Sequence, residues 1–160
     1  MDLRSHANQL LAGAAETLKL ERLEFNERDE CIVTFDERVV VLFSLDLEDL
    51  NGIVINVLLG ALPPEGKREA VMTELLSGNF CWARTEGGTI GVDRATGVIT
   101  LSYLVELPLE VPEQFSDICA KLLNVADYWM RKIEETGGIA PETVPAGALS
   151  SGGIGPAMRV

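Results

Sequence analysis

The sequence has few of the residues that catalyse reactions or bind metals. It contains one histidine, His6, and three widely spaced cysteines, Cys31, Cys81 and Cys119. A nucleophilic cysteine needs a neighbouring base, and we expect His6 to be a solvent-exposed helix residue. An odd number of separated cysteines fits neither a disulfide framework nor a zinc site and is typical of a reducing cytosol. The sequence therefore predicts no catalytic residue and no metal site.

Motifs for nucleotides and calcium are also missing. The turns Glu86-Gly87-Gly88 and Thr96-Gly97 join expected strands rather than opening a helix, so neither matches a phosphate-binding loop. The acids at Asp46, Glu48 and Asp49 lack the calcium-loop pattern and indicate a solvated turn. A pair of carboxylates among the 25 acids stays open as a hydrolytic alternative. We expect a protein that is not an enzyme and has no cofactor.

Positive charge and long apolar runs are scarce. The chain has 13 Lys and Arg against 25 Asp and Glu, which gives a net charge of −12. This balance argues against binding to nucleic acid or anionic membranes, and it suits a partner with a basic segment or simply a soluble acidic protein. No run approaches the roughly 20 apolar residues that span a bilayer, and the N-terminus lacks the apolar core of a signal peptide. The sequence predicts a cytoplasmic protein without membrane insertion.

The chain is nevertheless rich in apolar residues, at 47% of 160, and their spacing predicts a mixed fold. Periods of three and four predict helices over residues 2–19, 67–76 and 113–135, the last with Trp129 in the core. Asp2 is expected to cap the first helix, and Ser77-Gly78-Asn79 to stop the second. Alternating or β-branched runs predict the remaining elements as strands. These are residues 21–26, 31–36, 39–45, 53–62, 80–84, 89–93 and 98–105.

The stretch from Glu74 to Val105, ELLSGNFCWARTEGGTIGVDRATGVITLSYLV, resembles the small type III secretion chaperones of the Tir chaperone family. The shared features are a helix ending in Leu-Leu, Asn79, an aromatic-containing strand, Gly-Gly, Gly91, Gly97 and a long apolar strand. The likeness extends over residues 1–135. It implies an α+β fold, with a curved antiparallel sheet and N-terminal, middle and C-terminal helices, in a homodimer. The implied function is to bind the extended N-terminal segment of a secreted effector and keep it non-globular; the alternative is a dimeric regulatory or adaptor protein that binds a folded partner.

The resemblance also places two surfaces on the sequence. The strand and helix from Ile53 to Leu76 correspond to the family's dimer interface, and the early strands correspond to its effector groove. The run from Val39 to Leu45 is apolar on both faces, so it is either buried on both sides or open to a partner. Ordinary core packing is the alternative for each position. The dimer candidates are Val54, Leu58, Val71, Met72 and Leu75, and the effector-binding candidates are Leu23, Phe25, Ile32, Val40 and Leu42.

The composition changes after residue 135. Residues 136–160 are rich in Gly, Pro, Ser and Ala, as in flexible tails, so we divide the chain into a domain of residues 1–135 and a tail of residues 136–160. The tail also contains spaced apolar residues. A second hypothesis is that they lie along a groove on a neighbouring chain and imitate a bound peptide. These residues are Ile139, Val144, Leu149 and Ile154.

Overall fold

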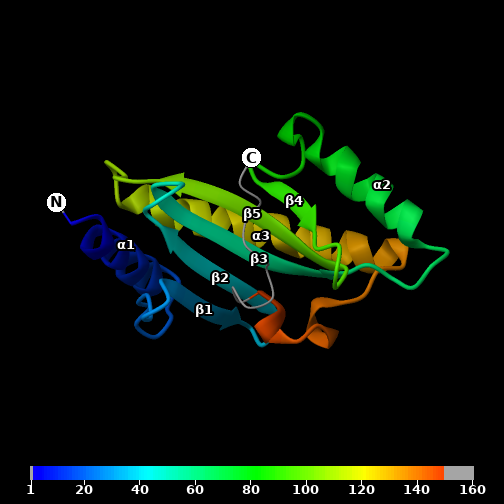
Figure 1. Ribbon diagram of the computed structural model, residues 1–160, viewed down its shortest axis with the longest axis horizontal. Helices are drawn as coiled ribbons and strands as arrows, with labels where there is room; N and C mark the ends of the chain where they lie inside the picture. Colours follow the sequence, from blue (N-terminus) through cyan, green and yellow to red (C-terminus); the bar gives the residue numbers. More distant parts are fainter. Residues whose placement is uncertain (1, 150–160) are drawn as a thin grey trace.

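The computed structural model describes residues 2–149. The helices are α1 (Leu3–Thr17), α2 (Arg68–Asn79) and α3 (Glu113–Thr136), with 3-10 turns η1 (Phe80–Trp82), η2 (Pro141–Thr143) and η3 (Ala146–Leu149). The strands are β1 (Glu30–Phe35), β2 (Val39–Asp46), β3 (Gly52–Ala61), β4 (Thr89–Val92) and β5 (Val98–Glu106). They form one antiparallel sheet in the order β1-β2-β3-β5-β4, with α3 running behind it (Figure 1). The α+β prediction is confirmed.

The main core lies between the sheet and the helices α1 and α3. Alternate residues of β2 and β3 point into it because successive side chains of a strand face opposite sides: Phe43 pairs with Ile55, and both are 1% exposed. Phe115 of α3 packs against Phe43, with ring centroids 6.1 Å apart. The expected stripe of α3 is confirmed, and Trp129 is fully buried in this core. We call this side of the sheet the inner face and the opposite side the outer face.

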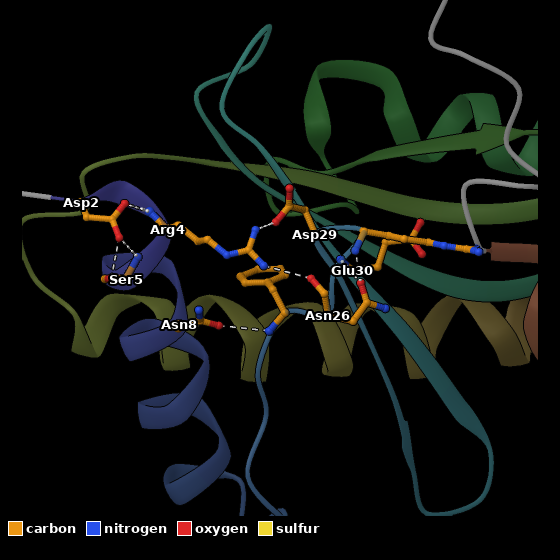
Figure 2. Close-up of polar contacts among 9 residues, drawn as sticks. Asp2, Arg4, Ser5, Asn8, Asn26, Asp29 and Glu30 are labelled. Atoms are coloured by element: carbon orange, nitrogen blue, oxygen red, sulfur yellow. Dashed lines mark hydrogen bonds and ion pairs between the residues drawn. The ribbon is translucent and has the colours of Figure 1, made fainter.

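The first helix is tied to the segment that follows it. Asp2 caps α1 as predicted, because its carboxylate accepts hydrogen bonds from the backbone N–H groups of Arg4 (3.2 Å) and Ser5 (3.3 Å). Figure 2 shows the Arg4 guanidinium pointing at Asp29 and donating to the carbonyl of Asn26 (2.9 Å). Asn8 accepts a hydrogen bond from the backbone N–H of residue 25 at 3.0 Å. These contacts with α1 replace a strand ladder, so the strand predicted at residues 21–26 is wrong.

Near α2, one predicted boundary is three residues short and one predicted strand is wrong. The helix is predicted to end at Leu76, but it continues to Asn79, the last residue of the predicted Ser77-Gly78-Asn79 stop. Within this last turn Gly78 faces the ring of Trp129, where a Cβ would overlap it. The strand predicted at residues 80–84 is the 3-10 turn η1, in which Cys81 and Trp82 both have φ of 52°. Asn79 then holds β4 through two hydrogen bonds with the backbone of Ile90, at 2.8 and 2.9 Å.

His6 is also not where the sequence places it. Its side chain is buried, at 8% exposure, because α1 turns that position towards the core rather than to solvent. The remaining boundaries agree well: Pro112 begins α3, and Gly137 ends it with φ of 100°, a conformation that favours glycine. Over residues 2–149, the structure contains no helix long and apolar enough to span a membrane.

Candidate protein-binding surfaces

The outer face of the sheet carries a small apolar cluster of its own. Val40 and Leu42 of β2, Leu58 of β3 and Val98 of β5 are buried there, at 8%, 1%, 0% and 6% exposure. They come together because β2, β3 and β5 are neighbours and each points alternate side chains outward. We call these four residues the outer-face cluster. The prediction that Val39–Leu45 is apolar on both faces is confirmed.

The structure brings three of the five effector-binding candidates to this side of the sheet. Ile32 of β1 pairs with Leu42 and is 46% exposed, and Val40 lies two residues along β2. Leu23 and Phe25 lie elsewhere, at 8% and 6% exposure in the main core. Whether any of the five contacts an effector stays a prediction, and only the first three share a face.

The same side of the molecule has an open sheet edge. Within residues 2–149, β1 pairs with β2 and with no other strand. The carbonyl of its first residue, Glu30, accepts a hydrogen bond from the N–H of Asn26 at 2.9 Å. An edge strand exposes unpaired backbone groups, which can accept an added strand from another chain. The exposed Ile32 on this strand adds an apolar contact point beside the edge.

A second apolar surface extends along α2 and η1. Met72, Leu76, Phe80 and Trp82 are 43%, 67%, 74% and 61% exposed, and we call these four residues the α2 apolar surface. Figure 1 shows α2 beside β4, at the opposite end of the sheet from α1. Exposed apolar patches of this kind on a folded domain mark surfaces for association.

Only part of this surface was predicted. Of the five dimer candidates, Met72 is on it, and Val54 is half-buried on the sheet. Leu58, Val71 and Leu75 are at most 3% exposed, so they pack within this chain. The sequence contained a usable signal for the missed residues: Met72, Leu76 and Phe80 are four residues apart, which places them on one side of an extended helix. The predicted helix ends at Leu76 and places Phe80 in a strand, so the prediction missed this spacing.

The segment after α3 packs on the chain's own sheet. Ile139 forms a two-residue bridge with Ala61, with hydrogen bonds of 3.0 and 2.9 Å. Leu149 is fully buried in the outer-face cluster, and Val144 packs against it. The hypothesis that these residues lie on a neighbouring chain is therefore wrong for all three, and Ile154 lies outside the described residues. We call residues 139–149 the C-terminal arm.

The titratable groups give little sign of catalysis. Burial raises the pKa of the Cys119 thiol to about 12, and burial also raises the pKa of Cys31. A thiol in this state is a poor nucleophile. The backbone N–H of Asp49, followed by those of Leu50 and Glu48, lowers the pKa of Asp46, which closes the expected turn. Among the residues of the described range, no three His, Cys, Asp or Glu side chains are placed to hold a metal ion.

Comparisons with known proteins agree with this architecture. The transcriptional anti-antiactivator ExsC of Pseudomonas aeruginosa is 30% identical over 131 residues, which cover 82% of this chain and 88% of that protein. A crystal structure of the ExsC–ExsE complex contains a similar chain, with a TM-score of 0.67 and 28% identity over 82% of this chain and 96% of that one.

A more distant structure has the same fold. It is the HopA1–SchA chaperone–effector complex, with a TM-score of 0.65 and 17% identity over 80% of this chain and 95% of that one. The sequence profile of the Tir chaperone protein (CesT) family matches residues 9–130. With three quarters of its length matched by that profile, the chain belongs to the Tir chaperone protein (CesT) family.

Proposed function

We propose that this chain is a cytoplasmic type III secretion chaperone that binds an extended N-terminal segment of a secreted effector and keeps it non-globular. The observation that carries the proposal is the open edge of β1, where Ile32 is 46% exposed next to the outer-face cluster. Main-chain groups of the edge supply affinity for an extended segment, and apolar pockets beside it select alternate side chains. The net charge of −12 favours a segment with basic residues.

The proposed chaperone acts as a homodimer. The α2 apolar surface supports this because four large side chains at 43% to 74% exposure are unfavourable in water unless something covers them. A second copy presents the same surface to the first, as a two-fold symmetric interface requires. The dimer also doubles the area over which a disordered segment is ordered, which helps to offset its loss of conformational entropy.

A regulatory role is the second candidate. The 30% identity to a transcriptional anti-antiactivator supports it. In this role the chain binds a compact regulator instead of, or in addition to, an effector segment. The two candidates differ in the partner: a chaperone client is unfolded where it is bound, and a regulator is folded.

The test is capture of partners on the tagged full-length chain in its native bacterium, followed by limited proteolysis and mass spectrometry. Three baits are compared: the wild type, Ile32→Asp at the β1 edge, and Leu47→Asp. Leu47 is 38% exposed in the turn after β2, so its variant introduces the same charge close to the start of β1 but outside the edge strand itself.

The chaperone role predicts one main partner, protected from protease only across an N-terminal stretch, retained by Leu47→Asp and depleted at least tenfold by Ile32→Asp. If the partner is instead protected from protease as a compact domain, the result supports the regulatory role. Equal recovery on all three baits contradicts a client site at the β1 edge.

A further inference from the structure

The C-terminal arm is joined to the sheet at a site shaped to receive it. Immediately after α3, Gly138 and Gly60 lie where the arm meets β3, and a Cβ on either would collide with Ala61, Ile133 or Ile139. Gly60 has φ of 141° and lies at a register shift of β3 against β5. These two glycines allow Ile139 to approach closely enough to pair with Ala61. The start of the arm is therefore a defined element of the fold.

Ion pairs hold the next part of the arm, around η2, against the domain. Arg38, in the turn between β1 and β2, forms ion pairs with Glu134 of α3 (2.9 Å) and with Glu142 of η2 (2.6 Å). Pro141 is buried beside these pairs. The arm is thus held near the end of β1, next to the edge assigned to the client.

The distal part of the arm is held differently. The backbone N–H groups of Val144 and Ala148 donate locally, to the carbonyls of Pro141 (2.9 Å) and Pro145 (2.9 Å). Contact with the sheet is made by side chains, chiefly Leu149, which is 0% exposed among the four residues of the outer-face cluster. A segment held by one buried anchor and short-range bonds opens more readily than a paired strand.

The arm does not fill the face that it covers. A groove of about 320 Å³ continues beside Leu149, and its walls combine apolar and polar side chains. The lining includes Val92, Val98, Asn56, Thr100 and Ser102, from β3, β4 and β5. The outer face therefore offers room for a segment longer than the part of the arm that lies on it.

We propose that the outer-face cluster is a docking site for an extended segment with spaced apolar side chains, and that the C-terminal arm is a built-in competitor for it. The arm imitates the client by placing Leu149 in the cluster, and a client segment that enters along the face displaces it. This inference rests on the proposed function for the identity of the client. Whether the arm competes with a second segment for the outer-face cluster can be tested on this chain without knowing the client.

The test uses the full-length chain and a synthetic peptide with the arm's own sequence, IAPETVPAGAL, residues 139–149. Leu149→Asp removes the anchor and frees the cluster, and Leu47→Asp is the control with the same change of charge. Binding is followed by the NMR methyl signals of Val40, Leu42, Leu58 and Val98. A peptide carrying Asp in place of its last leucine controls for non-specific binding.

We expect the peptide to shift those methyl signals in Leu149→Asp with an affinity at least tenfold above that for the wild type and for Leu47→Asp. The reason is that a tethered arm competes at an effective concentration on the order of millimolar. The control peptide leaves the signals unchanged. Equal binding to all three chains overturns the proposal, as does no binding to Leu149→Asp at millimolar peptide.

A second comparison uses the oxidised and reduced forms of one protein and does not depend on the fold of Leu149→Asp. Val98 and Leu149 belong to the same apolar cluster and line the same groove, so Val98→Cys with Leu149→Cys, in a Cys81→Ser background, is used to cross-link the arm to the sheet. The oxidised form should bind the peptide at least tenfold more weakly than the reduced form of the same protein. Equal binding by both forms, or no disulfide under oxidising conditions, contradicts the proposal.

The outcomes of this test and of the capture experiment are separable. The peptide comes from this chain, so its binding does not depend on recovering an effector. A failure to capture a client leaves the peptide result standing, and a peptide that does not bind leaves open the binding of effectors at the β1 edge.

Discussion

The indole ring of Trp129 lies directly against Gly78, so that helices α2 and α3 meet where one residue has no side chain. Trp129 is fully buried, and its Nε1–H donates a hydrogen bond to the carbonyl of Arg84 at 2.8 Å. A single ring therefore contacts α2 and fixes the loop that follows η1. The contact positions the α2 apolar surface relative to the rest of the molecule.

Gly78→Ala should destabilise the protein by about 1–3 kcal/mol, because the added methyl overlaps the ring and forces both helices to shift. This sign is opposite to that expected from helix propensity alone. The measurement is urea unfolding followed by circular dichroism.

Gly13→Ala is the matched control for that variant. Gly13 lies inside α1, and a Cβ there meets no atom within 4 Å. Alanine should therefore stabilise the protein by about 0.5–1 kcal/mol. A stabilising Gly78→Ala would show that Trp129 and α2 are not in contact in solution.

Val71 and Leu76 lie on opposite sides of α2 and should respond differently to a charge. Val71 is 1% exposed, so Val71→Asp should lower the free energy of unfolding by about 3 kcal/mol or more through an uncompensated buried charge. Leu76 is 67% exposed, so Leu76→Asp should change monomer stability by less than about 0.5 kcal/mol. Analytical ultracentrifugation should show that Leu76→Asp weakens dimerisation at least tenfold. An unaffected dimer would exclude α2 from the interface.

Cys81 is a natural chemical probe of the interface, because it lies within the α2 apolar surface. It is exposed in η1 between Phe80 and Trp82, whereas Cys31 and Cys119 are buried. A maleimide at pH 7 should label Cys81 first and Cys119 more slowly by at least about two orders of magnitude, because burial holds the Cys119 pKa at about 12.

If a second copy covers the α2 apolar surface, the rate of Cys81 labelling should fall as the protein concentration rises. The Leu76→Asp variant should label at a rate that does not depend on concentration. Identical rates for the two chains at every concentration would speak against a dimer through this surface.

Arg38→Gln should loosen the C-terminal arm while leaving the domain folded. It removes the ion pairs with Glu134 and Glu142, each worth roughly 0–1 kcal/mol for partly exposed groups. Hydrogen exchange of the Ile139 amide, which donates to Ala61, should accelerate several-fold. Arg22→Gln is the control, because its pair with Glu24 is far more exposed. No change in Ile139 exchange would mean that Arg38 does not hold the arm.

Several elements follow from the sequence because local signals and packing agree. Three signals predict the same helix: a proline at its start (Pro112), an apolar stripe that includes Trp129, and a glycine after its end (Gly137). Helix α3 begins directly after Pro112 and ends directly before Gly137. The two-sided apolar run of Val39–Leu45 predicts a strand with both faces covered, and β2 has one face on the main core and the other under the arm.

Other elements depend on partners that are far away in the sequence. Phe80 and Trp82 alternate as in a strand, yet positive φ angles at residues 81 and 82 turn the chain after α2. Gly78 has the appearance of a stop signal and is instead a packing position for a ring 51 residues later. The candidate binding residues show the same limit. The alternation of side chains along a strand places Val40 and Leu42 on one face of β2, but only the tertiary fold shows that Ile32 shares this face and that Phe25 is buried in the core.

The glycine at position 60 allows the presence of a C-terminal arm of this kind in related proteins to be judged from their sequences. An arm with its first contact at Ala61 requires a residue without a Cβ near the end of the third strand, and a further glycine just after the last helix. A family member with both glycines and a downstream leucine is expected to shield its own sheet. One with a bulky residue at either position is expected to present that sheet uncovered, and to differ in how readily it takes up cargo.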